Sequence, residues 1–295
     1  MKGEAARLAE KYCVDEYTDY MIYNYLASHE KNEKLKKVLE ELAKEEYEHY
    51  IFWSSLLGRK CDVSISKAKL RLIRAIRAVF GLTFTLKFLE RHESEVIAEY
   101  REYLKYLEDG DARRRLEKII EEEEKHENEL IAGIEETIVR YLSFIVLGLA
   151  DAIVEITGVH AGFLGVTSKT LMAGIAGLVV GLSAAISMAS AAYLQAKSDP
   201  TREPLTSALM TGAGYLAAVA LLAAPYFLIQ SMLAAFTVSV LGGIALIGLF
   251  TYYSAIVFDR PFTREFIEST TLMLGTALAS YIFGDIIGAK FNLHT

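Results

Sequence analysis

The pattern of apolar and polar positions divides the 295-residue chain into two contrasting parts. In the first part, apolar residues recur every three or four positions between charged ones, as on the buried side of an amphipathic helix. Beyond about residue 140 the apolar runs are nearly continuous, and several exceed the roughly 20 residues that a helix needs to cross a bilayer. The pattern therefore predicts an all-α protein, with a helical bundle in residues 1–137 and a membrane part in residues 138–295.

Four helices are predicted in the first part. The first covers residues 4–29 and the second residues 33–57, separated by a short polar turn. The third covers residues 85–107, and the fourth starts near Asp111. No proline interrupts the chain from there to Arg140, so the fourth helix is expected to continue directly into the first membrane span.

A basic segment connects the second predicted helix to the third. The second helix is expected to end at Gly58, and Ser66 is well placed to cap a following helix. Residues 67–82 carry five positive charges and no negative one, interleaved with apolar side chains. Two interpretations stay open: a solvated crossover helix, as bundles with one long connection require, or a helix lying on anionic lipid headgroups.

One acidic motif occurs twice in the bundle. In each copy a glutamate is followed seven residues later by a tyrosine, and thirty residues later by a second glutamate with a histidine three positions beyond. The first copy is Glu16, Tyr23, Glu46 and His49; the second, displaced by 77 positions, is Glu93, Tyr100, Glu123 and His126. Residues three apart share one face of a helix, and a thirty-residue spacing allows the chain to return antiparallel. Matched hairpins would then bring four carboxylates and two imidazoles together.

This donor set indicates a metal site. Carboxylates and neutral imidazoles favour iron, manganese or zinc over softer ions. The two tyrosines are candidates for hydrogen bonds to the ligands or for packing beside them. Neighbouring acids are either additional, exchanging ligands or part of a solvated face: Glu45, Glu90, Glu95 and Glu122.

The membrane part is expected to contain five spans. They cover residues 141–166, residues 170–196, two spans within residues 204–258 with a break near Pro225 to Ser231, and residues 266–289. Small residues are frequent in them, as close packing of helices in lipid requires. In the second span these are Gly174, Gly177, Gly181, Ser183, Ala184 and Ala185.

The short loops between the spans predict an orientation. With the N-terminus inside, the inner loops carry Arg140, Lys197, Arg202, Arg260 and Arg264, and the outer ones carry Lys169 and Lys290. This distribution satisfies the positive-inside bias, and an odd number of spans places the C-terminus outside.

Two acids lie inside the first span. Asp151 and Glu155 are four residues apart and share a helix face, so together they would form a cation site on an ion path. The alternative is that they lie near the membrane surface or stabilise a helix contact. Asp285 is closer to the outer end and is interpreted as interfacial, and His160 lies near the exit of the first span.

Charge and cysteine content limit the possible partners and compartments. The net charge of −7 argues against a nucleic-acid partner, and 54 of the 69 charged residues lie in residues 1–137. Cys13 and Cys61 suggest no disulfide framework and match no zinc spacing; Cys13 is expected in the core. The N-terminus lacks the apolar region of a signal peptide, so the first part is expected in the cytosol.

Residues 8–136 resemble a rubrerythrin or ferritin-like di-iron domain through the repeated motif. The resemblance implies iron ligands at Glu16, Glu46, His49, Glu93, Glu123 and His126, with Glu46 and Glu123 of the bridging type. Manganese or zinc would also suit such a site. Unlike full rubrerythrin, the chain has no Cys-x-x-Cys pair, so it lacks a rubredoxin iron centre for electron transfer.

Residues 138–290 resemble the vacuolar iron transporter family. The resemblance is carried by residues 151–158 with Gly162, and by Ser187 to Ala189 with Tyr193. It implies a homodimer that exports Fe²⁺ or Mn²⁺ in exchange for protons, with Asp151 and Met188 at the positions of the family's first-span acid and second-span methionine. Two features differ: a glutamate usual after that methionine is Ala192, and an acidic insert is reduced to residues 197–203.

The combination resembles prokaryotic membrane-bound ferritin-like proteins. We therefore expect an iron exporter in a prokaryotic cell membrane, whose path contains Asp151, Glu155 and Met188, and whose bundle captures, oxidises or senses metal. One alternative is a membrane-tethered ferroxidase or peroxidase that uses the spans mainly as an anchor. Another is a regulatory bundle that shifts the transporter between states.

Overall fold

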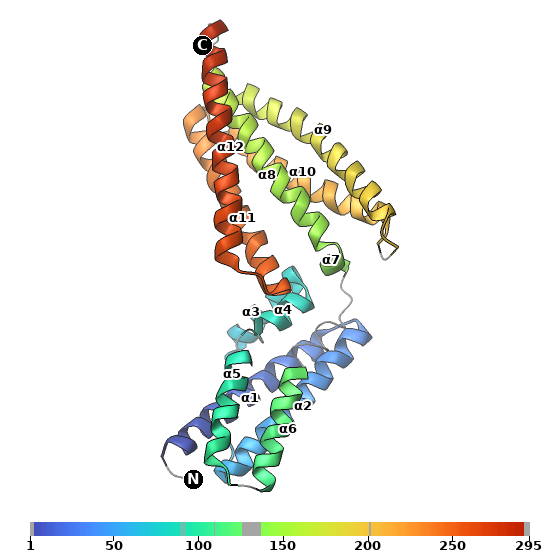
Figure 1. Ribbon diagram of the computed structural model, residues 1–295, viewed down its shortest axis with the longest axis vertical. Helices are drawn as coiled ribbons and strands as arrows, with labels where there is room; N and C mark the ends of the chain where they lie inside the picture. Colours follow the sequence, from blue (N-terminus) through green and yellow to red (C-terminus); the bar gives the residue numbers. More distant parts are fainter. Residues whose placement is uncertain are drawn as a thin grey trace. The chain divides into compact units, whose positions relative to one another are not determined.

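The computed structural model describes residues 3–89, 91, 93–108, 110–125, 137–200 and 202–291, without the side chains of residues 93, 94, 125, 137 and 138. Every regular element within those ranges is helical, as predicted (Figure 1). The chain divides into two compact units, residues 1–136 and residues 137–295. Each unit is considered by itself.

The first unit is built on two long antiparallel helices and a second, shorter pair. α1 (Glu4–His29) packs along α2 (Glu33–Leu57), and α5 (Glu93–Tyr103) packs against α6 (Asp111–Lys125). The last turn after α5 tightens into a 3-10 helix, η2 (Leu104–Tyr106). These four helices supply the side chains of the site described below.

An aromatic core joins the helix pairs. Trp53 of α2 is fully buried, with its ring centroid 4.9 Å from that of Tyr12 on α1 and 5.1 Å from that of Tyr100 on α5. Tyr103 of α5 also packs on Trp53, at 5.0 Å. Aromatic rings bury large apolar areas, so this core fixes α5 against α1 and α2.

The ends of α2 and the start of the next helix follow their capping residues. The side chain of Asn32 accepts hydrogen bonds from the backbone N–H of Lys34 and of Leu35 at the start of α2. Gly58 ends α2 with a φ of 68°, a conformation in which a side chain would be strained. Ser66 accepts a hydrogen bond from the backbone N–H of Lys69, 3.2 Å away. The predicted stop and the predicted cap are both confirmed.

The basic segment forms the helix α3 (Lys67–Phe80). Ile73 is buried on one side of it, and Arg77 forms an ion pair with Glu30, 2.7 Å apart. On the other side Leu72 and Val79 are 61 % and 69 % exposed. The helix is therefore amphipathic with part of its apolar surface uncovered, and contact with lipid stays a prediction.

The predicted third helix, residues 85–107, is wrong as a single element. The structure has α4 (Leu82–Leu89) followed by α5, which starts only at Glu93. Gly81 adopts a φ of 90° and ends α3. Leu82 and Leu86 of α4 are fully buried against the apolar side chains of α1 and α2. The apolar run thus forms a short helix that covers the α1–α2 pair, and the charged residues after it begin a separate one.

The two cysteines are bonded, which contradicts the expectation of no disulfide. Cys13 of α1 and Cys61 in the loop after α2 form a disulfide, with Cα atoms 6.3 Å apart. The loop after Gly58 passes over α1 and brings together two residues 48 positions apart in the sequence. That return path depends on tertiary packing, which residue spacing alone does not reveal.

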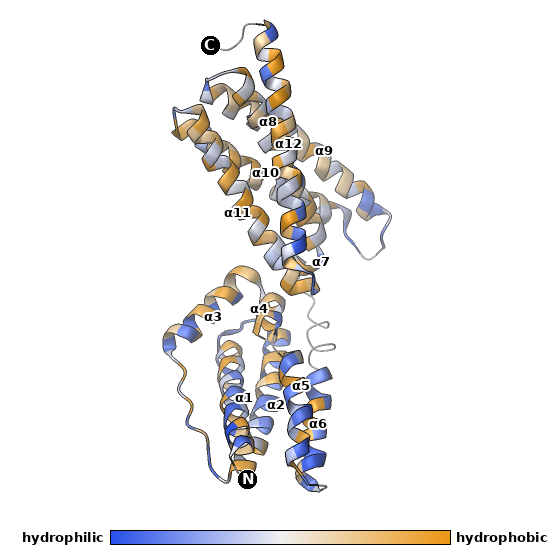
Figure 2. Ribbon diagram, turned by 60° about the vertical axis from the view of Figure 1, so that its left-hand side comes forward, coloured by the Kyte–Doolittle hydropathy of each residue, from blue (hydrophilic) through white to orange (hydrophobic). Residues whose placement is uncertain are grey.

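The second unit contains five helices long and apolar enough to cross a membrane, as predicted. They are α8 (Leu142–Val166), α9 (Thr170–Lys197), α10 (Pro204–Leu228), α11 (Met232–Phe258) and α12 (Phe262–Phe291), preceded by the short α7 (Thr137–Arg140). Figure 2 shows their predominantly apolar sequence, in contrast to charged helices such as α6. These lengths and compositions mark the chain as an integral membrane protein.

α8 is the central helix of this unit, because it packs against each of the other four spanning helices. Its contact with α12 is very close at Gly165. A Cβ atom there would lie 2.6 Å from the carbonyl oxygen of Tyr281 and 2.6 Å from the amide nitrogen of Asp285. Small residues thus allow these backbones to approach, as membrane packing requires.

One detail of the predicted spans is modified, and another falls outside the described residues. The break between the third and fourth spans lies after Leu228, with Ser231 capping α11, and Pro225 stays inside α10. The expected continuous helix from the bundle into the first span falls on residues 126–136, outside the described part of the chain.

Candidate metal centre

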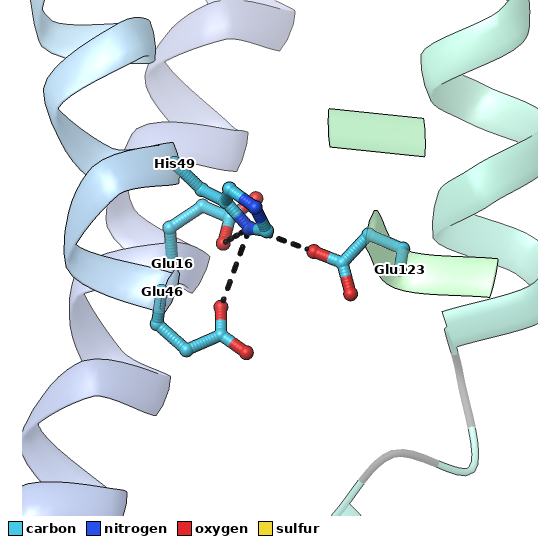
Figure 3. Close-up of side chains that lie close together, drawn as sticks. All are labelled: Glu16, Glu46, His49 and Glu123. Atoms are coloured by element: carbon cyan, nitrogen blue, oxygen red, sulfur yellow. Dashed lines mark ion pairs between the residues drawn. The ribbon is translucent and has the colours of Figure 1, made fainter. Parts of the chain in front are cut away.

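Four acid and imidazole side chains from three helices converge in the first unit (Figure 3). Glu16 lies on α1, Glu46 and His49 lie one turn apart on α2, and Glu123 lies on α6. All four are buried, with 1–5 % of each residue exposed. One potential ligand atom from each lies within 4.8 Å of the others. Four of the six predicted ligands are therefore brought together.

One ring nitrogen of His49 faces all three carboxylates. Nδ1 lies 2.9 Å from Oε1 of Glu123, 3.4 Å from Oε2 of Glu16 and 3.9 Å from Oε2 of Glu46. A single imidazole nitrogen offers either one N–H or one lone pair. One hydrogen bond from Nδ1 cannot satisfy all three carboxylates. A cation between them could bind the three carboxylates and the imidazole nitrogen together.

The other ring nitrogen of His49 meets a different acid. Nε2 lies 3.4 Å from Oε2 of Glu122, whose Oε1 lies 2.6 Å from Nζ of Lys118. The hydrogen bond with His49, together with Lys118, lowers the pKa of Glu122 to about 2 although burial opposes this. Glu122 is therefore ionised, and it fixes the ring so that Nδ1 points at the other three acids.

Burial makes the negative charges of the cluster costly in the absence of a cation. The pKa of Glu46 is raised well above its usual value by burial and by the nearby charges of Glu123 and Glu16. Burial alone would lower the pKa of His49, but Glu16 and the hydrogen bonds to Glu122 and Glu123 outweigh it and raise that pKa. Such a cluster retains protons that a divalent ion would displace.

The two predicted tyrosines have different environments. The hydroxyl of Tyr100 donates a hydrogen bond to Oε1 of Glu16, and its role beside a bound metal stays a prediction. Its pKa is raised by burial and by the charges of Glu16 and Glu123, so the phenol stays protonated. Tyr23 is also buried, in the apolar cluster that packs under α4.

The remaining members of the repeated motif are only partly visible. Glu93 begins α5, but its side chain lies outside the described part of the chain, as does His126 entirely. Of the additional acids, Glu45 is half-buried, Glu95 is exposed and Glu90 is likewise outside the description. Their proposed ligand roles stay predictions.

Sequence reasoning missed Asp19. Its pKa is raised to about 8, by burial first and then by the charges of Glu16 and Asp15. Asp19 follows Glu16 by three positions and so shares its helix face, a signal that was present in the sequence. It adds a fourth acid to the electrostatics of the cluster.

The cluster suits a transition-metal ion of intermediate hardness. Three carboxylates and one imidazole, without a thiolate, are the donors that iron, manganese and zinc accept. The raised pKa of the buried Glu46 and the ring-orienting Glu122 are what a site prepared for a cation would contain. The donor set therefore fits the ion that the sequence predicts.

A second group of predicted residues meets in the membrane unit. Asp151 and Glu155 of α8 and Met188 of α9 line one cavity of about 500 Å³. Ser183 and Ser187 of α9 complete its polar lining. The three residues that the sequence assigned to an ion path are thus adjacent, and their role stays a prediction.

Glu155 has a partner that the sequence did not reveal. The hydroxyl of Tyr215 on α10 donates a hydrogen bond to Oε2 of Glu155. Glu155 also lines a second cavity of about 520 Å³ between α8, α9 and α12. Nothing in an apolar span identifies which distant acid a tyrosine will contact, so this pair required the structure.

Asp285 and His160, the other two ionisable residues that the sequence analysis named in the spans, do not line the first cavity. Asp285 is exposed on α12, and its interfacial position stays a prediction. His160 is fully buried on α8, with its ring centroid 4.0 Å from that of Tyr226. The absence of a Cβ atom at Gly177 leaves space for its imidazole.

Comparison with known proteins identifies the first unit. Residues 10–132 match the sequence model of the family described as Rubrerythrin. No curated protein and no solved structure matches the chain, so the resemblance to vacuolar iron transporters stays a prediction. The matched segment contains every member of the buried cluster. Residues 10–132 therefore form a rubrerythrin/ferritin-like domain, a type of domain that implies a di-iron site.

Proposed function

We propose that the protein exports Fe²⁺, with Mn²⁺ as a second cargo, across a prokaryotic cell membrane in exchange for protons. The observation that carries this proposal is the shared cavity of Asp151, Glu155 and Met188 in a unit of five spanning helices. The same chain holds a buried cluster suited to the same ions. A homodimer with a cytosolic N-terminal domain and an external C-terminus completes the proposal.

The cavity offers chemistry for a divalent cation. Asp151 and Glu155 present two carboxylates on one face of α8, one turn apart. Met188 contributes a polarisable sulfur that favours transition metals over Ca²⁺ or Mg²⁺. Tyr215 orients the Glu155 carboxylate and leaves its second oxygen for the ion. Proton exchange follows naturally, because each carboxylate binds either a cation or a proton.

In the N-terminal domain, Glu16, Glu46, His49 and Glu123 would hold the metal. Glu122 orients the His49 ring, and Tyr100 donates a hydrogen bond to Glu16 that directs its free oxygen. The aromatic core around Trp53 excludes water from one side of the cluster. A bound iron pair supplies one-electron redox chemistry toward dioxygen or peroxide.

An alternative function is a membrane-tethered ferroxidase or peroxidase. The rubrerythrin match and the buried cluster support this enzyme activity directly. A single span would suffice for an anchor, however, and an anchor has no need of two acids on a cavity between α8 and α9. The same cavity favours transport over a purely enzymatic role, and it is compatible with a bundle that regulates the transporter.

Metal flux in proteoliposomes tests the proposal. We expect the purified protein to move Fe²⁺ or Mn²⁺ under a pH gradient, and the variants Asp151→Asn and Glu155→Gln to lose this flux. Asp285→Asn is a matched control, because this acid is exposed on α12 and does not line the cavity of Asp151. Undiminished flux in both cavity variants would overturn the proposed path.

A further inference from the structure

The disulfide lies in the apolar core that borders the candidate metal-binding residues, through Tyr100. Cys13 is fully buried and Cys61 is 8 % exposed, and both belong to the apolar cluster formed around Trp53 and Tyr100. Tyr100 in turn donates its hydrogen bond to Glu16. One continuous, water-poor region therefore contains the two sulfur atoms and the edge of the metal site.

The spacing along α1 places one sulfur close to a metal ligand. Cys13 precedes Glu16 by three residues on the same helix. Side chains three apart share a face, with Cβ atoms about 5–6 Å apart. An electron that passes from Cys13 to Glu16 therefore travels about one helical turn.

A cytosolic location would make a purely structural role less suitable for this bond. Disulfides in reducing compartments are usually transient and catalytic or redox-sensing. The chain has two cysteines in total and no Cys-x-x-Cys pair, so the given sequence does not itself contain a rubredoxin centre. The Cys13–Cys61 pair is therefore the candidate electron donor within this chain.

We propose that Cys13 and Cys61 form a redox-active pair that supplies two electrons to the metal cluster during peroxide reduction. This inference rests on the metal-binding part of the proposed function, not on transport. In the step, the two thiols lose two protons and two electrons and form one S–S bond. These two electrons would return two oxidised metal ions to their reduced state, and the two protons would balance the reduction of one H₂O₂ to two H₂O.

An external thiol regenerates the pair. Exchange begins when a thiolate attacks an accessible disulfide sulfur. Cys61, in the loop after α2, is the more exposed residue at 8 %, whereas Cys13 is fully buried, with Sγ 3.4 Å from Oγ of Ser54. The attacking thiol therefore forms a mixed disulfide at Cys61 and releases Cys13 as the thiolate. A second thiol then frees Cys61.

The experiment uses the full chain in detergent, reduced with dithiothreitol, desalted anaerobically and loaded with Fe²⁺. One equivalent of H₂O₂ per metal pair is added, and an alkylating reagent then traps free thiols for intact-mass analysis. We expect both thiols to disappear while the iron is recovered as Fe²⁺ with a chromogenic chelator. In Cys61→Ser we expect the iron to remain oxidised, since a single thiol cannot close the bond.

A metal-site variant separates this inference from direct oxidation of the thiols. Glu46→Ala retains both cysteines but lacks a ligand, so we expect its thiols to survive the same peroxide addition. Thiol loss at equal rates in Glu46→Ala and the wild type would overturn the inference. So would a disulfide that dithiothreitol cannot reduce in the folded protein, or wild-type iron that stays oxidised beside two free thiols.

Two further measurements distinguish the possible failures. Iron content shows whether Cys61→Ser still folds and binds metal, and a wild-type protein without bound iron would itself contradict the inference. Metal flux of the same preparation tests the transport proposal. Normal flux with unresponsive thiols would remove the redox role and leave the proposed function intact.

Discussion

His49 presents its two ring nitrogens to different surroundings, and this division of roles organises the site. Nδ1 faces Glu16, Glu46 and Glu123, while Nε2 meets Glu122. The ring is held by an acid that does not itself face the cluster. Orienting partners of this kind set both the direction and the basicity of a ligating imidazole.

Removing this orienting acid should weaken metal binding without abolishing it. We expect Glu122→Gln to lower the affinity for Fe²⁺ or Mn²⁺ by about 10–100-fold, the usual effect of losing a group that orients a ligand. Competition with a chelator of known affinity measures the change. Glu121→Gln is the matched control, because Glu121 is exposed on the same helix. Equal affinities in the two variants would refute the orienting role.

The buried Glu46 and its half-buried neighbour Asp19 also predict how the metal-free protein responds to pH. Asp19 has a pKa of about 8 in the fold against 3.8 in its absence, and Glu46 is raised in the same direction. Between these values the folded state binds more protons than the unfolded state, so the free energy of unfolding falls as pH rises. We expect the first unit of the apo protein to melt at a lower temperature at pH 8 than at pH 5.

The fluorescence of Trp53, the chain's single tryptophan, reports this unfolding from beside the site. Asp19→Asn should reduce the dependence on pH, since the amide cannot ionise. Saturation with metal should reduce it as well, because the cation compensates the charges. A melting temperature that rises steadily from pH 5 to 8 in the apo protein would contradict the assignment.

At the residue scale, part of the candidate metal site could be predicted from the sequence. The spacing of Glu16, Glu46, His49 and Glu123 was enough to predict the buried cluster, because helical periodicity converts spacing into a shared face. The contact of Glu122 with His49 and the Cys13–Cys61 bond were missed. Both depend on how separate elements pack, and no local periodicity encodes that information.

At the scale of elements, α1, α2 and the start of α3 were predicted as the structure has them. α2 ends at Gly58 and α3 starts after Ser66, as expected from capping chemistry. The segment between Gly81 and Glu93 was misassigned, because its apolar run forms a short covering helix in place of the start of a long one. The burial of Leu82 and Leu86 decides this, and it is a tertiary effect.

Close packing between α8 and α12 leads to a stability prediction. A side chain at Gly165 would meet the α12 backbone at Tyr281 and Asp285. We expect Gly165→Ala to destabilise the membrane unit by about 1–3 kcal/mol, the usual effect of overpacking. Thermal unfolding in detergent measures it. Gly275→Ala on α12 is the control, because a Cβ atom there meets nothing within 4 Å, and matching losses would indicate that glycine itself, not the contact, is responsible.

For the whole molecule, the question is whether the metal-binding domain serves the membrane unit. A domain that captures scarce ions should raise transport most when metal is limiting. We expect Glu46→Gln to reduce flux at low metal concentration while leaving the maximal flux close to that of the wild type. Initial rates over a range of Fe²⁺ concentrations measure this. Identical rates at every concentration would assign the domain to sensing or detoxification.

The division into two units was predictable because one part of the sequence has the composition of a helical bundle in water and the other that of helices in lipid. Charge alternation marks the bundle, and uncharged runs of helical length mark the spans. The pairing of Tyr215 with Glu155 was not predictable, since an apolar span carries too little variation to reveal its neighbours. The homodimer and the membrane orientation stay predictions.

The central position of α8 has a mechanical consequence. This helix touches α9, α10, α11 and α12, and it also carries Asp151 and Glu155. Because α8 packs against four helices, it would stay fixed during the proposed transport cycle, together with the carboxylates of Asp151 and Glu155. Helices packed around it would then rotate or slide. Because the cavity lies between α8 and α9, α9 would be the helix that moves to open it. A covalent cross-link between α8 and α9 should therefore stop metal transport, whereas a cross-link between α8 and α12 should permit it.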